Sequence, residues 1–96
     1  MTTFLHIGIA FADAPKVVEL EPVFNKALDW LRYAPNCYVV KTKRSPRTWL
    51  QRLRPHLSSG DHVFIVQVDV TQRGGLLPRW AWDWLAAQSA TEEWRG

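Results

Sequence analysis

The chain has 96 residues, of which 47% are apolar, and a net charge of +3. This size allows one domain with a single core and excludes a multidomain organisation. Its one cysteine, Cys37, excludes an internal disulfide and fits a reducing compartment. No apolar run approaches the roughly 20 residues that span a bilayer, and no signal segment is recognisable. We therefore expect a soluble cytoplasmic protein without membrane contact.

The positive charge is concentrated in one part of the chain. No acidic residue lies between Asp29 and Asp61, whereas the rest of the chain has five cations against nine acids. Segregated charge of this kind bears on binding partners more than on the fold. The window contains seven of the twelve cations, namely Arg32, Lys41, Lys43, Arg44, Arg47, Arg52 and Arg54.

The N-terminal third predicts a strand followed by a helix. Residues 3–11 (TFLHIGIAF) are almost continuously apolar, as in a central strand covered on both faces, and His6 is expected to be packed there with its ring nitrogens satisfied. The apolar periodicity predicts a helix over residues 19–28, and Pro22 places its start close to Leu20. Residues 30–34 (WLRYA) fit either a continuation of this helix or a short strand.

The middle of the chain predicts a strand and a second helix. Residues 37–43 (CYVVKTK) alternate weakly and end in two cations on one face. Ser45 and Pro46 are typical of the N-cap and first residue of a helix, and Pro55 should end or bend it in its last turn. The face expected to be buried consists of Trp49, Leu50 and Leu53.

The C-terminal third predicts the strongest strand and a third helix. Residues 62–70 (HVFIVQVDV) alternate clearly, with a fully apolar face formed by Phe64, Val66, Val68 and Val70. Pro78 opens a helix that carries Trp80, Trp82 and Trp84, and so short a helix must bury these rings against the sheet or a second subunit. We expect one domain over residues 1–88 and a frayed tail over residues 89–96.

Most catalytic signatures are missing from the sequence. It has no glycine-rich phosphate loop, no paired metal-ligand spacing and no nucleophile elbow. Cys37 is expected to be a small buried apolar residue, because no histidine pairs with it by spacing. Asp13, Asp61 and Asp69 lie near strand ends, where turn residues are common. We therefore expect no metal and no cofactor, with Asp13 as the one weak candidate for a catalytic group.

The order of elements, with two strand–helix units and a final strong strand, resembles the ferredoxin-like βαββαβ architecture. The fold class is therefore predicted as α+β, a ferredoxin-like sandwich with an antiparallel sheet and an extra tryptophan-rich helix. More narrowly, VVKTKRSPRTWLQRLRPHLSSGDHVFIVQV followed by GGLLPRWAWDWL resembles small bacterial proteins called SinR-like, which are similar to the CRISPR-associated protein 2 and VapD ribonuclease group. The resemblance covers Cys37 to Leu85, about half of the chain.

This resemblance implies several structural and functional features. Residues 30–34 become an edge strand, and two copies form a homodimer with facing sheets, across which the helix carrying Trp80, Trp82 and Trp84 packs. The nucleases of the group carry an aspartate directly after an aromatic residue at the end of the first strand. Here Phe11 is followed by Ala12 and only then by Asp13, and a shift of one residue along a strand turns the side chain to the opposite face.

The sequence is compatible with three functions. The leading hypothesis is a non-catalytic or weakly catalytic dimer that binds nucleic acid through a basic patch. The alternative is a protein-binding inhibitor from a phage or mobile element that grips an acidic surface of a host defence complex. A metal-dependent nuclease using Asp13 is the third. The residues expected to bind nucleic acid or an acidic partner are Lys41, Lys43, Arg44, Arg47, Gln51 and Arg54.

Overall fold

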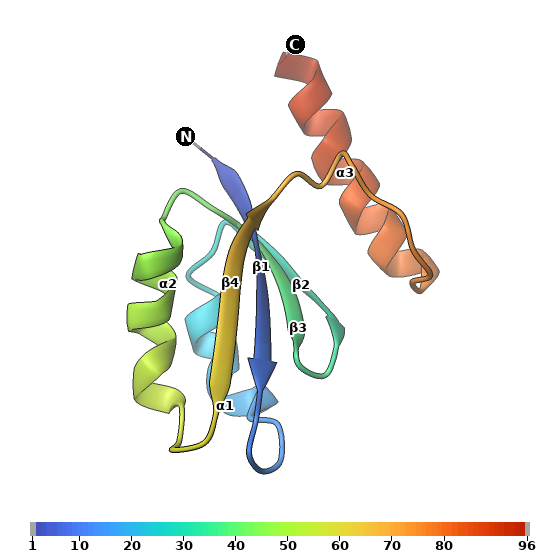
Figure 1. Cartoon of the computed structure of the whole chain (residues 1–96). Helices are drawn as coiled ribbons and strands as arrows, with labels where there is room; N and C mark the ends of the chain where they lie inside the picture. The colour runs from blue at the N-terminus through green and yellow to red at the C-terminus, as the bar shows by residue number, and fades with distance from the viewer. Residues whose placement is uncertain (1, 96) are drawn as a thin grey trace.

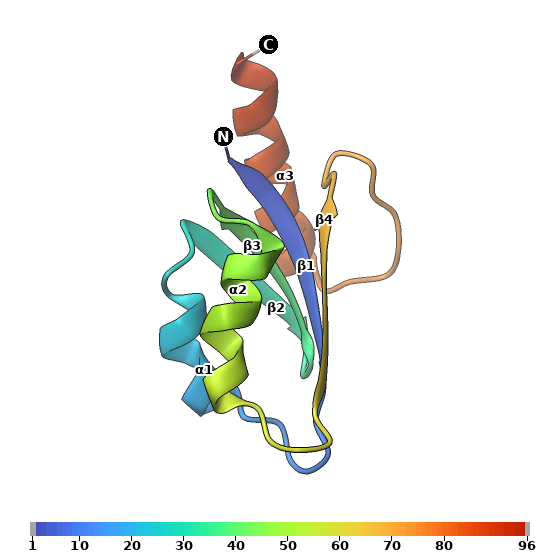
Figure 2. The same ribbon diagram turned by 60° about the vertical axis from the view of Figure 1, so that its left-hand side comes forward.

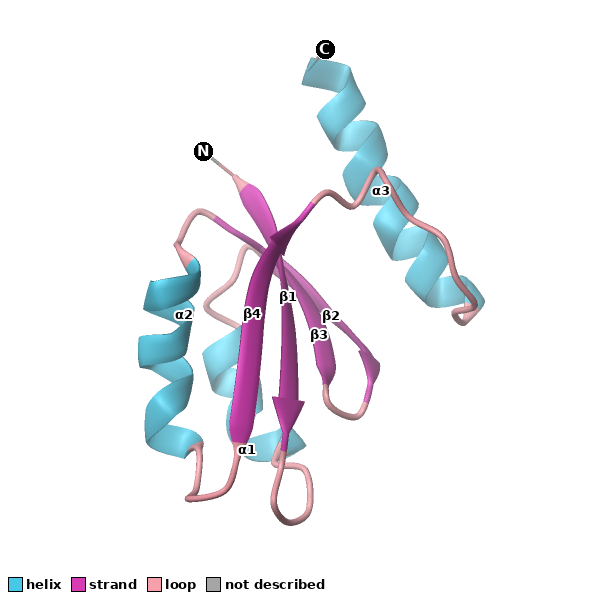
Figure 3. Ribbon diagram, in the orientation of Figure 1, coloured by secondary structure: helices cyan, strands magenta, loops and turns pink. Residues whose placement is uncertain are grey.

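The computed structural model describes the backbone of residues 2–95 and the side chains of residues 2–88. It contains a four-stranded antiparallel open sheet and, within the described residues, three α-helices, so the predicted α+β class is confirmed (Figures 1 and 3). The elements follow in the order β1 (Thr3–Ala10), α1 (Val17–Phe24), β2 (Asp29–Ala34), β3 (Cys37–Thr42), α2 (Pro46–Leu53), a 3₁₀ helix (Arg54–His56), β4 (His62–Val68) and α3 (Arg79–Arg95).

The strands are arranged in the order β2-β3-β1-β4, with every neighbouring pair antiparallel. β1 is therefore a central strand, as predicted, and β2 and β4 form the two edges. Helix α1 connects β1 to β2, and β3 lies between these two strands in the sheet. Helix α2 connects β3 to β4, and β1 lies between these two strands. Each helical connection thus encloses one antiparallel strand.

Helices α1 and α2 lie on the same side of the sheet, which we call the α1/α2 face (Figure 2). Trp49 and Leu53 of α2 are completely buried there. Phe24 of α1 stacks on Tyr38 of β3 with the ring centroids 3.8 Å apart. These contacts form the main core, whose buried members are Leu5, Ile7, Ile9, Leu20, Val23, Phe24, Tyr38, Val40, Trp49 and Leu53.

Helix α3 packs on the opposite side, the α3 face, so it docks on the sheet of its own chain. Ala81 and Leu85 are buried against residues of the sheet, and Trp84 meets Phe4 edge-on with a centroid separation of 6.4 Å. The buried members of this second cluster are Phe4, Leu31, Val39, Val70, Ala81 and Leu85. The helix covers only part of this face, because Phe64 and Val66 of β4 remain 67% and 38% exposed.

The N-terminal helix is displaced from its predicted position. α1 begins at Val17 and ends at Phe24, so Pro22 lies inside the helix rather than in its first turn. The helix does not continue towards residue 34, because the backbone N–H of Leu28 donates to the carbonyl of Lys41 at 2.8 Å and the following residues pair with β3 as strand β2. The edge-strand interpretation of residues 30–34 is therefore confirmed.

The predicted alternation of β4 is confirmed, and its two faces meet different surroundings. On the apolar face, Phe64 and Val66 are exposed, whereas Val68 and Val70 pack in the cluster under α3. On the other face, Val63 and Ile65 pack against the main core. The strand ends at Val68, because the Asp69 carboxylate accepts from the N–H of Thr71 at 3.0 Å and closes a turn. At the C-terminus, α3 continues to Arg95, beyond the expected helix end at residue 88; the side chains of the predicted tail lie outside the described residues.

Candidate binding surface on helix α2

Helix α2 is held firmly at its start and along its buried face. The Ser45 hydroxyl accepts from the N–H of Thr48 at 3.2 Å and Pro46 is the first helical residue, as predicted. The indole N–H of Trp49 donates to the Thr42 hydroxyl at 3.0 Å inside the core. Because these contacts fix the rotation of the helix, its outer face has a defined set of side chains.

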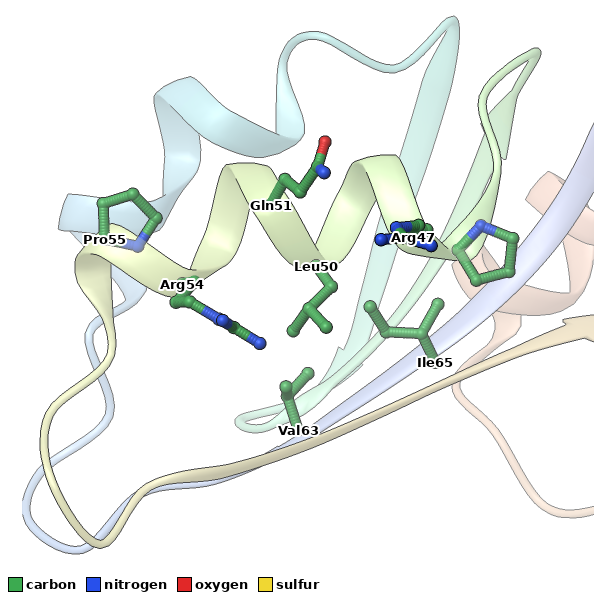
Figure 4. Close-up of a pocket in the computed structure, with 8 residues that line it drawn as sticks. Arg47, Leu50, Gln51, Arg54, Pro55, Val63 and Ile65 are labelled. Carbon is green, nitrogen blue, oxygen red and sulfur yellow. The ribbon is translucent and has the colours of Figure 1, made fainter.

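Arg47, Gln51 and Arg54 share the outer face of α2 and are exposed, as their spacing predicts. They line a groove of about 730 Å³ between α2 and β4. In Figure 4 the Arg47 and Arg54 side chains flank the groove, and the apolar side chains of α2 and β4 converge between them. The other residues that line it are Pro46, Leu50, Pro55, Val63 and Ile65.

The structure divides the predicted basic patch. Lys43 and Arg44 are exposed in the short connection from β3 to α2, so they extend the row of cations beyond the start of the helix. Lys41 lies on the α3 face, because the register places it beside Phe4, which packs under α3. We call the remaining group, Lys43, Arg44, Arg47, Gln51 and Arg54, the α2 stripe.

The cations of the α2 stripe have no carboxylate partner in the described part of the chain. The ion pairs found there join Lys16 to Asp61, His56 to Glu19 and Arg79 to Asp83. Arg52, on the same helix, is turned inward and lies 5.1 Å from the centre of the Trp49 ring. Within the described residues, the positive charge of the stripe is therefore not neutralised by an ion pair.

The sequence did not predict the apolar floor of the groove, which is formed by Leu50, Val63 and Ile65. The alternation of β4 showed that Val63 and Ile65 share a face, and periodicity placed Leu50 on the buried side of α2. Nothing in either pattern indicated that these two faces meet beside the arginines. That meeting depends on the α2 crossover, which the sheet order alone reveals.

Asp13 is exposed in the connection from β1 to α1. Among residues 2–88, no three histidine, cysteine, aspartate or glutamate side chains come together in a way that could hold a metal ion. The nearby Asp61 carboxylate is held by hydrogen bonds, because it accepts from the N–H of Ala12 at 2.7 Å and of Ser58 at 2.8 Å. These hydrogen bonds lower the pKa of Asp61. Asp61 thus ties two loops together.

A second polar group lies on the α3 face. The Nε2 atom of His6 and the hydroxyl of Tyr33 are 2.6 Å apart, which satisfies one ring nitrogen, as expected of a packed histidine. Burial lowers the pKa of His6. Burial, followed by a hydrogen bond with the side chain of Cys37, raises the pKa of Tyr33 to about 12. Both shifts favour the uncharged forms of His6 and Tyr33. The neighbouring Cys37 is half-buried.

The three tryptophans proposed for a dimer interface have different environments. Trp82 and Trp84 are partly buried against the second cluster of their own chain, whereas Trp80 is 53% exposed. Trp80 is therefore the member of the three that presents the most free ring surface.

No helix in the described part of the chain combines the length and apolar character needed to cross a membrane. The chain matches no protein-family model, no curated protein and no solved structure. Its function is therefore argued from the geometry of the α2 stripe and the surfaces beside it.

Proposed function

We propose that the protein is a homodimeric, non-catalytic or weakly catalytic nucleic-acid-binding protein of ferredoxin-like architecture, related to the SinR-like proteins and the CRISPR-associated protein 2 group. The architecture is supported by the order of elements up to β4 and by two helical connections that each enclose an antiparallel strand. The observation that carries the binding function is the α2 stripe, an exposed row of cations without carboxylate partners among the described residues.

The dimensions of the stripe suit a phosphate backbone. Arg47 and Arg54 are seven residues apart, which corresponds to roughly 10 Å along the helix axis. One strand of B-DNA advances about 3.4 Å per phosphate, so this distance covers about three nucleotides. Lys43 and Arg44 extend the row past the N-terminus of α2. Contacts of this kind read charge rather than base sequence.

The homodimer is supported by the uncovered half of the α3 face. Phe64 and Val66 are exposed there, and Trp80 presents further apolar surface. Neighbouring exposed apolar residues on an edge strand can form part of an interaction site. A second copy placed against this region would cover these residues and double the number of α2 stripes in the assembly.

The test is the salt dependence of binding to duplex DNA and duplex RNA, measured by fluorescence anisotropy. Each phosphate contact contributes about −0.9 to the slope of log K on log salt for B-DNA, so Arg47→Ala with Arg54→Ala should flatten the slope by roughly two units. Lys26→Ala with Arg79→Ala removes the same charge from exposed sites elsewhere and should leave the slope nearly unchanged. Equal slopes for the two double variants contradict the proposal.

A protein-binding module is the second candidate, because the groove beside the stripe has an apolar floor. Val63 and Ile65 contribute apolar side chains from β4, and the charged phosphates of a nucleic acid do not bind to an apolar surface. In this alternative the protein is an inhibitor from a phage or mobile element, and Arg47 and Arg54 grip an acidic part of a host defence complex. Arginine is enriched among the residues that dominate protein interfaces.

A further inference from the structure

Strand β4 has an open edge along its whole length. Within the described residues it pairs with β1 alone, so alternate N–H and C=O groups point away from the sheet. Natural proteins blunt such edges with lysine, proline, bulges or a very short strand. β4 has seven residues, His62–Val68, and contains neither lysine nor proline. Its edge is therefore available for pairing with another extended segment.

The two sides of this edge differ in chemistry. On the α1/α2 side lies the groove, where Arg47 and Arg54 stand beside Val63 and Ile65 (Figure 4). On the α3 side the exposed residues of β4 are His62, Phe64 and Val66. A strand added to the edge would direct alternate side chains into these two environments.

We propose that the open edge of β4 binds an extended peptide segment of a partner protein in which acidic and apolar residues alternate. The segment becomes a fifth strand, its acidic side chains reach the arginines of the groove, and its apolar side chains lie against Phe64 and Val66. This inference rests on the second candidate function and names its partner chemistry. It does not require nucleic-acid binding, although both proposals use Arg47 and Arg54.

The charge of the groove selects the acidic residues. Among its lining residues there is no carboxylate, and both charged members are arginines. Neighbouring side chains on one face of a strand are about 7 Å apart, whereas Arg47 and Arg54 are separated by roughly 10 Å along α2. Long arginine side chains span this difference, so two acids on the same face can be bound together. Gln51, between the arginines, can donate or accept a further hydrogen bond.

Selectivity for the alternating pattern is the first test. A fluorescein-labelled peptide Glu-Val-Glu-Val-Glu-Val-Glu is compared with Glu-Glu-Glu-Glu-Val-Val-Val, which has the same composition and charge. We expect the alternating peptide to bind the wild-type protein at least about tenfold more tightly, because only it presents one kind of residue to each side. Equal affinity for the two peptides would mean that charge alone drives binding and would overturn the inference.

The contribution of the arginines is measured with the same alternating peptide. Arg47→Ala with Arg54→Ala should weaken binding by roughly tenfold, a range expected for two partly exposed ion pairs. The charge-matched control, Lys26→Ala with Arg79→Ala, should bind as the wild type does. If the control loses as much affinity as the groove variant, the peptide is held by the overall field and the assigned site is wrong.

Pairing with the strand edge is tested through the backbone. Two alternating peptides are N-methylated, one at every glutamate and the other at every valine. Because an extended strand directs alternate N–H groups to opposite sides, only one of the two should lose binding. The outward-facing amides of β4 should also become protected from hydrogen exchange when the peptide binds. Equal effects of the two methylation patterns, or no change in β4 exchange, would overturn the inference.

The same titrations separate the inference from the nucleic-acid proposal. If an oligonucleotide binds through the α2 stripe while the alternating peptide does not bind, the inference is overturned and the proposed nucleic-acid function stands. If the peptide binds as described and no oligonucleotide does, the inference stands and the nucleic-acid function fails. The peptide competes with the second copy of the proposed homodimer for Phe64 and Val66, so an excess of peptide should dissociate the dimer. A dimer that the peptide cannot dissociate would also overturn the inference.

Discussion

The hydroxyl of Thr42 joins the end of β3 to helix α2. It is buried and accepts hydrogen bonds from the indole N–H of Trp49 and from the backbone N–H of Arg44, both at 3.0 Å. Because the α2 stripe begins immediately after this point, Thr42 helps to set the rotation of the helix that presents the arginines.

Thr42→Val should therefore destabilise the protein by about 1–3 kcal/mol, since it leaves two donors without their acceptor. The free energy of unfolding from urea denaturation measures the loss. In a Trp49→Phe background one of these donors is absent, so the same substitution should cost less. Fully additive effects of the two substitutions would show that the hydrogen bond contributes nothing to stability.

Asp61 makes the protein sensitive to acid. Its side chain is only 2% exposed and accepts from two backbone N–H groups and from the ammonium of Lys16. These hydrogen bonds lower the pKa of Asp61 from its usual value, so the folded state holds the proton less strongly than the unfolded state does. Its stabilising effect is therefore complete above the unfolded-state pKa and is lost as the pH falls towards the lowered pKa.

We expect the melting temperature of the wild type to fall between about pH 5 and pH 3 more steeply than that of Asp61→Asn. The amide has no comparable titration, and the variant should be less stable than the wild type at neutral pH because it accepts fewer hydrogen bonds. Thermal unfolding followed by circular dichroism across this range measures both effects. Parallel pH profiles would show that other carboxyl groups cause the acid sensitivity.

At the scale of elements, helix α3 takes part in the fold through a narrow face. Ala81, Leu85 and Gln88 are buried and lie four and three residues apart, while Trp82 and Trp84 flank them. The burial of the small residue Ala81 at the N-terminal end of this face means that the helix approaches the sheet closely there. The tryptophans then close the sides of the contact, as the edge-on meeting of Trp84 with Phe4 illustrates.

Ala81→Glu should release α3 from the sheet, because it would bury a charge without a partner in an apolar cluster. The expected result is a red shift of tryptophan fluorescence, with the strand signal in circular dichroism retained, because the main core lies on the other face. Ala86→Glu introduces the same charge at an exposed position of the same helix and should leave the spectrum unchanged. Similar red shifts in both variants would contradict this packing.

At the scale of the whole molecule, the distribution of apolar surface is uneven. The α1/α2 face is covered by two helices, whereas the α3 face is covered only in part. The sheet therefore presents Phe64 and Val66 to solvent on an edge strand. The cations of the α2 stripe lie beside this same strand, so a binding partner or a second copy could contact both.

We expect light scattering to give twice the 11.1 kDa mass of one chain at tens of micromolar protein. The physical reason is the uncovered apolar area, which a second copy would remove from water. Phe64→Lys with Val66→Lys should return the mass to that of one chain, because charges would enter the contact. A wild-type mass near 11.1 kDa at these concentrations would exclude the homodimer.

The sequence alone determined the local features. Ser45 and Pro46 indicated the start of α2 because capping depends on neighbours within one turn, and the spacing of Arg47, Gln51 and Arg54 placed them on one face for the same reason. The alternation of residues 62–70 indicated β4, and the order of elements indicated the α+β class. Each of these inferences uses periodicity or contacts within a few residues.

Only the tertiary structure decided which faces meet. Periodicity shows that Val63 and Phe64 point to opposite sides of β4, but only the positions of the helices decide that Val63 packs against the main core while Phe64 remains exposed. In the same way, the register of β3 places Lys41 on the α3 face, away from the arginines of α2 that lie close to it in the sequence. The groove between α2 and β4 exists because the α2 crossover passes beside an edge strand, and a crossover joins residues that no local pattern connects.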